Sequence, residues 1–525
     1  MRISMFVWLL LYLSTCHGYR LLGVCPFHAK SHFIMFEQLM KGLARKGHQV
    51  DVISAFPLKK PYPNYTDIVK LKPPVVLVNN ITYDFMRQTL NANPTFAIAT
   101  IGGNDMCKNL GHPEIQKLVR NPPKDPPYDA IILEAFGFHC FAIIAHLWNV
   151  PLIGISTTSL YPWLHRLIGQ PENLAFVPNN YVTYVDDLNF WQRLYNSGNA
   201  LFNKLYFNYL TTKTQNNILR EHFGPDAPTV QELEKKFAII LINSHIVLNK
   251  LQPLVPAAIE VGGLHVQDEN LKLQPELEKW MNDSKDGIVY FTFGSMVMIE
   301  TFPREFLNIL YSSLRKIAPV RVLMKIPNPD KLPSGLPENV YTSPWMPQIK
   351  VLKHPNVKAF ITHGGLMGTQ EAITYGVPMI GIPLFADQFK NIDSYVVKNA
   401  ALKLDINTLT EKDMDEALHE ILRNPIYKES AQNISRRLTD QPLSSLDKAI
   451  YWTEYVIRYG NDALRSPAVD LPWYKLHLID VIAFLLLCAL GLIAVVAFVV
   501  RAILEVTTNH GKTIEINNLE SKKVK

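Results

Sequence analysis

The chain has 525 residues, 48% of them hydrophobic and 19% charged, which is enough for about two to three globular domains with well-filled cores. Its formal net charge of +6 is spread along the sequence, without the basic stripes and interleaved aromatic residues that bind nucleic acid. The sequence also contains no HExxH, Walker or GxGxxG motif, so we expect no metal, no bound cofactor and no nucleic-acid partner.

The N-terminus has the features of a cleaved secretory signal peptide, which we predict over residues 1–18. Arg2 is followed by an apolar stretch through Leu13, and small or neutral residues stand at Cys16 and Gly18. Asn-x-Ser/Thr triplets also arise by chance, but those in this chain support a glycosylated, lumenal body. They begin at Asn64, Asn80, Asn282 and Asn433.

Five cysteines are present, one of them in the leader and one in an apolar run near the C-terminus. The remaining three, Cys25, Cys107 and Cys140, are an odd number at unrelated spacings. We therefore expect no disulfide framework and no zinc site.

Apolar strands and an amphipathic helix alternate from residue 19 onward. The predicted elements are a strand, a helix and four further strands, at 19–25, 32–46, 48–54, 128–133, 150–155 and 237–242. This βαβ rhythm predicts a doubly wound α/β domain over residues 19–265.

Residues 161–210 interrupt the rhythm and are rich in Phe, Tyr and Trp. Part of the stretch has helical spacing, which favours ordinary packing for most of these side chains. The functional alternatives are an apolar acceptor pocket or a face that rests on a membrane.

A charged, proline-containing segment, predicted as a linker over 266–286, precedes a second α/β domain over 287–465. Its first strand ends at Gly294 and Ser295, and sheets of this kind bind ligands at the carboxyl ends of their strands. Helices from about residue 411 to 459 complete this domain.

Residues 345–391 hold the densest set of polar side chains between apolar strands. We predict strands at 357–362 and 379–382, with a glycine turn at 363–367 and a helix at 368–375 between them. The turn and the helix start leave free backbone N–H groups and a positive helix end at one spot. An anion such as a diphosphate can bind there without a lysine.

The side chains around this spot are complementary to a nucleotide sugar. Trp345 offers a flat face for a base, and Glu371 offers a carboxylate to a vicinal diol. Asp387 and Gln388 are placed to read sugar hydroxyls. Each residue also has a structural interpretation, because Trp345 can be core, Asp387 can cap a helix, and the Gly-Gly pair can form a tight turn.

Together these residues resemble the signature of the UDP-glycosyltransferase family, which runs from Trp-x-x-Gln through His-x-Gly and Glu to an Asp-Gln pair. The words HGGL, TQEA, NSH (243–245) and VGGLH (261–265) are most similar to membrane-bound arthropod members, and the resemblance covers residue 19 to the C-terminus. It implies the α/β fold called GT-B, in which two Rossmann-like, doubly wound domains face a cleft and the last helix of the second crosses back onto the first. The donor-binding residues that it implies are Ser295, Trp345, Gln348, His363, Gly365, Met367, Gly368, Glu371, Asp387 and Gln388.

Two positions depart from the family pattern. Met367 stands where plant and many mammalian members have a polar side chain, and Gly368 stands where arthropod members commonly have Ser. Backbone amides must then carry more of the contact with the phosphates.

The resemblance places the catalytic base at His32 and its carboxylate partner at Glu134, which follows the strand 128–133. A helix N-terminus disfavours the imidazolium, so His32 is expected to be neutral and able to accept a proton at about pH 7. From spacing alone, a helix-capping Ser31 beside an uninvolved His32 is equally supported. Many members have Asp at the position of Glu134, or an Asp where this chain has His139, which is the alternative base.

Residues 481–500 are apolar throughout and long enough, at ~1.5 Å per residue, to cross a ~30 Å hydrocarbon layer. An aromatic pair before this run favours a transmembrane helix over a buried core helix. The tail 501–525 carries Lys522 and Lys523, which resemble the di-lysine retrieval signal of endoplasmic-reticulum membrane proteins. The alternative is ordinary flanking charge.

The resemblance implies inverting transfer of a sugar from a UDP-sugar co-substrate to a hydroxyl of small lipophilic acceptors, in conjugation or detoxification. The similarity of the motifs to arthropod members favours glucose over glucuronate. A homo-oligomer is left open. The expected protein is a single-pass type I membrane protein of the endoplasmic reticulum with its body in the lumen. The alternative is a catalytically silent, membrane-anchored binding or regulatory subunit with the same fold.

Overall fold

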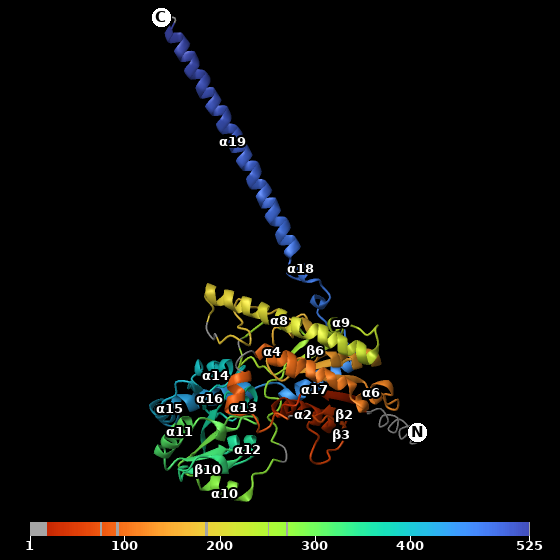
Figure 1. The fold of residues 1–525 in the computed structure, drawn as a ribbon, viewed down its shortest axis with the longest axis vertical. Helices are drawn as coiled ribbons and strands as arrows, with labels where there is room; N and C mark the ends of the chain where they lie inside the picture. Colours follow the sequence, from red (N-terminus) through yellow and green to blue (C-terminus); the bar gives the residue numbers. More distant parts are fainter. Residues whose placement is uncertain are drawn as a thin grey trace, which may run out of the picture. The chain divides into compact units, whose positions relative to one another are not determined.

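The computed structural model describes residues 18–73, 76–90, 94–183, 187–249, 251–268 and 271–523 (Figure 1). Almost all of the predicted signal peptide lies outside these residues. The chain divides into two units, Met1–Ser466 and Pro467–Lys525, and both predicted α/β domains belong to the first unit. The domain boundaries expected within that unit stay predictions.

The first domain is built on a seven-stranded, all-parallel sheet with the strand order β3-β2-β1-β4-β5-β6-β7. Its central strands are continuous apolar runs because helices cover both faces of such a sheet. The strands are β1 (Arg20–Cys25), β2 (Gln49–Ser54), β3 (Tyr65–Lys70), β4 (Ala130–Glu134), β5 (Leu152–Ser156), β6 (Phe237–Ile242) and β7 (Ala258–Glu260). This order confirms the predicted doubly wound topology.

The helices of the first domain are mostly short, and one is long. The long helix, α8 (Phe190–Phe223), starts at a capping box formed by Asn189 and Gln192 and contains the C-terminal part of the aromatic-rich stretch. The others are α2 (Lys30–Arg45), α3 (Tyr83–Phe85), α4 (Pro94–Ala99), α5 (Asp105–Cys107), α6 (Pro113–Arg120), α7 (Ile143–Trp148) and α9 (Val230–Glu234). Single π or 3-10 turns link several of them, at η1 (Met86–Leu90), η2 (Thr100–Asn104), η3 (Lys108–Gly111), η4 (His139–Ala142) and η5 (His165–Leu167).

The second domain has a six-stranded, all-parallel sheet with the order β10-β9-β8-β11-β12-β13. Its strands are β8 (Ile288–Thr292), β9 (Arg321–Lys325), β10 (Val340–Ser343), β11 (Val357–Thr362), β12 (Met379–Gly381) and β13 (Ala401–Lys403). Its helices are α10 (Pro275–Asp283), α11 (Arg304–Lys316), α12 (Gln348–Lys353), α13 (Leu366–Thr374), α14 (Gln388–Val396), α15 (Glu411–Arg423), α16 (Pro425–Thr439) and α17 (Ser445–Tyr459), with the 3-10 turns η6 (Ile299–Thr301) and η7 (Pro329–Lys331). The predicted linker contains α10, whose Leu277 and Met281 are buried in this domain's core.

Helix α17 returns to the first domain, as the resemblance implied. Leu446 and Ile450 belong to the first domain's core, and Ser445 Oγ donates to the carbonyl of Gly262 at 2.8 Å. The helix packs on α2 at Gly42, where a Cβ atom would lie 2.7 Å from Leu446 Cδ1. Glycine at position 42 therefore sets how closely the two helices approach.

A second crossing runs in the opposite direction. The backbone N–H of Asn79 donates to the carbonyl of Ser295 at 2.9 Å, and that of Ile81 donates to Met296 at 3.0 Å. Ile81 and Met86 are buried in the core of the second domain. Each domain thus lends a segment to the core of the other.

The cysteine prediction was wrong, because Cys107 and Cys140 form a disulfide with their Cα atoms 6.1 Å apart. The two cysteines are 33 positions apart in the chain, and the segment between them includes α6 and β4, which bring the end of α5 beside η4. Sequence spacing does not reveal this proximity, because it is set by the sheet topology. Cys25 is buried and its thiol lies 3.4 Å from Glu134 Oε2.

The second unit contains η8 (Pro467–Val469), α18 (Trp473–Leu476) and α19 (Ile479–Lys523). The part of α19 over Ile479–Lys512 is long and apolar enough to cross a membrane, by length and composition. It includes the predicted span 481–500.

Candidate active site

The two predicted catalytic residues meet at the carboxyl end of β4. His32 lies in the first turn of α2, and its Nδ1 is 2.6 Å from Oε1 of the fully buried Glu134. The hydroxyl of Thr157, just after β5, lies 2.8 Å from the same Nδ1 and donates to Glu134 Oε1 at 3.1 Å. A carboxylate accepts hydrogen bonds, so Nδ1 carries the proton and Nε2 is the basic end of the ring.

The capping alternative for this corner is wrong. The residue that precedes α2 is Ala29, and Ser31 is already inside the helix. The rings of Phe27 and Phe136 stand edge-on to His32, each with its centroid 4.8 Å from that of the imidazole. His32 therefore combines a polar anchor at Nδ1 with apolar walls, a setting suited to holding an apolar molecule beside a base.

The other candidate base, His139, belongs to a different cluster. Its Nδ1 lies 2.7 Å from Glu234 Oε1, and the second oxygen of Glu234 is 2.6 Å from Arg166 Nη2. Position 139 follows β4 by five residues, and η4 has by then turned the chain toward α9. Neither His139 nor these partners contact His32, and the His139 side chain is buried. His139 therefore lies apart from the predicted base, and its role as the alternative base stays a prediction.

In the second domain, the turns after β8 and β11 meet around the ring of His363. A Cβ atom at Gly294 would lie 2.7 Å from Cε1 of this ring, and a Cβ atom at Gly365 would lie 2.7 Å from Nε2. Both positions therefore require glycine. Burial, followed by the nearby charge of Lys325, lowers the pKa of His363 to about 3, so the ring is neutral. Its Nδ1 is buried without a hydrogen-bond partner among the described residues.

Glu371 lies one turn into α13 and is the centre of a buried network. Gln348 Nε2 donates to Glu371 Oε2 at 2.6 Å, and the hydroxyl of Tyr290 donates to Gln348 Oε1 at 3.1 Å. His265 Nε2 donates to the carbonyl of Met367 at 3.2 Å and lies 3.5 Å from Glu371 Oε1. Burial raises the pKa of Glu371 to about 7 and lowers that of His265 to about 4.

The two residues that depart from the family pattern have distinct surroundings. The side chain of Met367 packs against the first domain's core, so only its backbone is placed at the helix start. A Cβ atom at Gly368 would lie 3.3 Å from Gln348 Nε2. A side chain at position 368 would therefore press on the amide that holds Glu371.

Trp345 is not a core residue, since half of its surface (50%) is exposed. Lys325, the last residue of β9, places Nζ 5.5 Å from the centroid of this ring. The same Nζ donates to the carbonyl of Gly294 at 2.7 Å and to Asn79 Oδ1 at 2.5 Å. Burial lowers the pKa of Lys325 to about 8. Sequence reasoning missed this cation, although the strand-end rule that selected Ser295 applies equally to the end of β9.

Asp387 and Gln388 lie at the start of α14. The Gln388 side chain accepts from the backbone N–H groups of Leu384 and Phe385 at 2.8 and 3.0 Å, which leaves its NH₂ group as the donor. Asp387 makes no side-chain cap bond to the helix backbone and instead accepts from Asn391 Nδ2 at 2.9 Å. Burial raises the pKa of Asp387, and among the groups that oppose this shift is His32 of the first domain.

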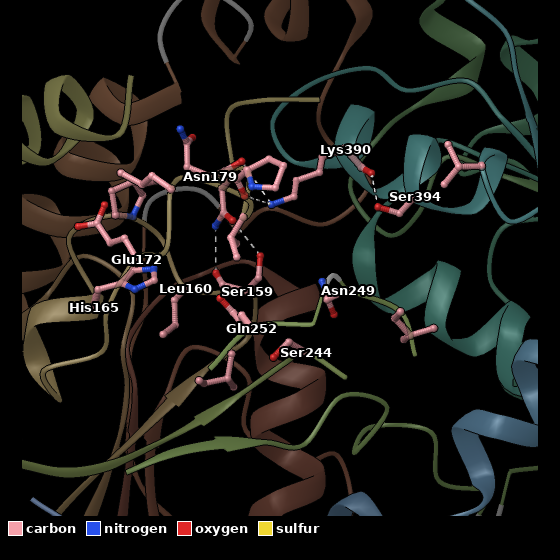
Figure 2. Close-up of a pocket in the computed structure, with 18 of the residues that line it drawn as sticks. Ser159, Leu160, His165, Glu172, Asn179, Ser244, Asn249, Gln252, Lys390 and Ser394 are labelled. Carbon is pink, nitrogen blue, oxygen red and sulfur yellow. Dashed lines mark hydrogen bonds between the residues drawn. The ribbon is translucent and has the colours of Figure 1, made fainter. Parts of the chain in front are cut away.

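A cavity of about 270 Å³ opens between the two domains, along α14 and beyond β5 and β6 (Figure 2). Lys390 reaches across it and donates to the carbonyls of Pro178 and Asn179 at 2.9 and 3.3 Å (Figure 2). The Ser159 hydroxyl donates to Asn180 Oδ1 at 2.9 Å. The lining mixes amides and hydroxyls with apolar atoms, and none of the predicted site residues contributes to it.

The remaining predicted residues are placed as follows. Ser295 accepts the backbone bond from Asn79 at the crossing between the domains. The four glycosylation candidates are all exposed, at Asn64, Asn80, Asn282 and Asn433. Among the described residues, no group of His, Cys, Asp and Glu side chains is arranged to hold a metal ion.

Two parallel Rossmann-type sheets, with the His32 cluster at the end of one and the glycine-lined turns around His363 at the end of the other, have the architecture of a GT-B glycosyltransferase. The family model described as "UDP-glucoronosyl and UDP-glucosyl transferase" matches residues 23–513, and the chain belongs to this family.

Similar proteins come from insects and mammals. UDP-glycosyltransferase UGT5 of Dactylopius coccus is 36% identical over 510 residues, with 94% of each chain covered. UDP-glucosyltransferase 2 of the same organism is 34% identical over 497 residues, again with 94% of each chain covered. Human UDP-glucuronosyltransferase 2B15 is 31% identical over 488 residues, with 90% of each covered.

Among solved structures, Phytolacca americana UGT2, complexed with UDP-2fluoro-glucose and pterostilbene, aligns with a TM-score of 0.56. The alignment covers 84% of this chain and 100% of that one at 17% identity, so it shows the shared fold alone.

Proposed function

We propose that the protein transfers glucose, with inversion and without a metal ion, from UDP-glucose to a hydroxyl of small lipophilic acceptors. The observation that carries this proposal is the contact of His32 with Glu134 and Thr157 on the domain opposite the anion cradle. With Nδ1 bonded in this way, His32 keeps Nε2 to accept a proton. The charge of His32 also acts on Asp387 in the other domain.

In this mechanism His32 Nε2 accepts the acceptor's hydroxyl proton while the acceptor oxygen bonds to the anomeric carbon. The bond from that carbon to the phosphate oxygen breaks, and UDP leaves with the electron pair. Glu134 accepts the Nδ1–H bond and stabilises the imidazolium that forms. The start of α13 and the neutral His363 ring provide donors and dipoles toward the developing negative charge on the leaving group.

Each part of the donor site is assigned a portion of the nucleotide sugar. Trp345 stacks on the uracil, and Glu371, oriented by Gln348, accepts hydrogen bonds from the ribose diol. Gly365 and the following backbone N–H groups bind the diphosphate. Asp387 and Gln388 bind hydroxyls of the sugar. Glu371→Ala should then weaken UDP binding, whereas Asp387→Ala should impair transfer with little effect on UDP itself.

Glucose is proposed as the sugar because one similar Dactylopius protein is named a UDP-glucosyltransferase, although the similar mammalian proteins are named glucuronosyltransferases. The lipophilic acceptor is supported by the apolar walls around His32. We further propose that α19 anchors the protein in the endoplasmic-reticulum membrane with the body in the lumen. The apolar helix and the terminal lysines support this location.

The direct test uses microsomes that contain the full chain, labelled UDP-glucose or UDP-glucuronate, and a panel of phenols. We expect a labelled glucoside that β-glucosidase cleaves and α-glucosidase does not, formed equally with and without EDTA. Tight UDP binding with no product from either donor, across the panel, would support the silent binding subunit instead. Faster transfer of glucuronate would overturn the assignment of the sugar alone.

A further inference from the structure

Helix α8 reverses the usual burial pattern of a surface helix, because it buries polar side chains and exposes aromatic ones. On the buried side, Asn196 Nδ2 donates to the carbonyls of Leu174 and Val177 at 2.9 Å, and Gln215 Nε2 donates to Gly137 at 2.7 Å. The large side chains exposed on the other side are Phe190, Trp191, Leu194, Tyr195, Leu201, Phe202, Leu205 and Tyr209, which together we term the α8 apolar face.

The α8 apolar face is one continuous surface. At ~100° per residue, its members fall within ~140° of the helix circumference, and they extend for ~30 Å along the axis. Exposure is high even for the largest rings, at 73% for Trp191 and 82% for Tyr209. Figure 1 shows α8 as a long helix lying along the outside of the first domain. An exposed apolar surface of this extent marks a binding site for another apolar surface.

The charge of α8 indicates what that surface is. From Phe190 to Arg220 the helix contains cations and no acid, and its first carboxylate is Glu221. Lys204 is paired with Glu172, but Lys213 and Arg220 continue the direction of the apolar face, at ~100° per residue, toward the helix end. Aromatic rings with flanking cations are typical of helices that lie at the interface of an anionic bilayer. A second copy of the chain would bring two cationic helices together, which disfavours a dimer through this face.

We propose that the α8 apolar face docks on the surface of a bilayer containing anionic lipids, with its aromatic rings at the level of the headgroups. This inference rests on the proposed membrane span, since residues 467–478, between the body and α19, reach at most ~40 Å when extended. The body is therefore always close to the bilayer. On its opposite side α8 holds Gly137, next to the Phe136 ring that contacts His32. When α8 is docked, only this helix separates the acceptor side of the site from the bilayer. Lipophilic acceptors concentrate in the bilayer.

The test uses nitroxide labels on the full chain, reconstituted in phosphatidylcholine vesicles with phosphatidylserine. Single cysteines are introduced as Leu205→Cys on the apolar face, Asn217→Cys as an exposed control on the same helix, and Leu492→Cys within α19. The background carries Cys16→Ala and Cys488→Ala, because the other cysteines are buried or in the disulfide. Collision of each nitroxide with oxygen and with a water-soluble nickel chelate is then measured.

We expect the label at 205 to collide several-fold more with oxygen than with the chelate, as at 492, whereas the label at 217 favours the chelate. Labels at 205 and 217 that are equally accessible to the chelate, with 492 in lipid, would overturn the docking and leave the span intact. A label at 492 that is open to the chelate would instead overturn the span. Spin–spin broadening at 205 that disappears on dilution with unlabelled protein would show a second copy on this face, which also overturns the proposal.

Discussion

The His32 ring has a polar and an apolar side, since Nδ1 contacts Glu134 and Thr157 while the ring packs edge-on against Phe27 and Phe136. Because the donor cradle lies in the other domain, His32→Ala should leave UDP binding nearly unchanged and lower kcat by roughly 10²–10⁴. Glu134→Ala should have a milder effect of the same kind. Initial rates and UDP calorimetry on both variants check this.

Acceptors of different acidity provide a control for the role of His32 as the base. A phenol should lose less rate than an aliphatic alcohol, because less of its proton transfer depends on the base. Near-normal turnover of an aliphatic alcohol by His32→Ala would remove this residue from the mechanism.

If Glu371 binds the ribose diol as proposed, nucleoside binding should depend on pH. Burial raises the pKa of Glu371 from 4.5 to about 7, so it is largely protonated below pH 7 in the free protein. The ribose diol donates to the ionised form, and uridine affinity should therefore rise with pH, by up to about tenfold per unit, and level off above about pH 7. Uridine is the suitable probe because it has the diol but no phosphate that titrates in this range. Glu371→Gln should bind more weakly with a flat pH profile; an unchanged slope in that variant would assign the titration to another group.

Residue types at strand ends could be predicted from the sequence, whereas their mutual contacts could not. Polar side chains between apolar strands mark Glu371 and Gln388, whereas His32 and Glu134 were assigned from the family resemblance. The sequence does not show that Gln348 orients Glu371, or that Thr157 joins the base, since both contacts depend on how neighbouring strands align. Lys325 was missed because the apolar residues around it make it resemble an edge of the core.

At the scale of elements, the contact of α17 with α2 predicts that one added methyl group at position 42 lowers the stability of the protein. Gly42→Ala places a Cβ atom 2.7 Å from Leu446 Cδ1, so the buried Leu446 side chain or α17 itself must shift, at a cost of about 1–3 kcal/mol. We expect a Tm lower by several degrees for the full-length protein in detergent. Combining Gly42→Ala with Leu446→Ala should cost less than the sum of the two changes.

A matched control for this contact is Gly198→Ala in α8, where nothing lies within 4 Å of the added atom. That change should leave Tm unchanged or raise it slightly, because alanine favours a helix over glycine by about 1 kcal/mol. Equal destabilisation by both substitutions would show that the effect at Gly42 reflects the loss of glycine and not the contact.

Most inner strands of both sheets follow from the sequence because apolar β-branched runs are a local signal, and β11 was predicted with its bounds unchanged. The strands β3, β7, β9, β10 and β13 were not predicted. Elements that depend on distant partners do not follow. The predicted linker contains α10, and the disulfide joins two short helical segments, α5 and η4, that only the sheet topology brings together. The stretch 77–87, which crosses to the second domain, has no pattern that distinguishes it from a surface loop.

For the whole molecule, the proposed orientation predicts the outcome of protease treatment. Protease added to sealed microsomes should remove only a short C-terminal piece, because the proposal puts the body in the lumen and the tail 501–525, which follows the predicted span, in the cytosol. Detergent should make the body accessible, which is the control. Loss of the body in sealed vesicles would contradict this orientation.

Helix α17 packs on the first domain and residues 77–87 pack on the second, so the two domains cannot be exchanged between related proteins at a single junction without changing these contacts. A chimera joined near residue 286 would take the cradle from one parent and the base from another, which is the obvious way to exchange acceptors while keeping the donor. It would also inherit α17 from the wrong parent, against the foreign equivalent of Gly42, and would seat a foreign Ile81 in the second core. A fusion that returns α17 to its own first half, with a second junction before Ser445, preserves the helix contact and leaves only the Ile81 crossing to be matched.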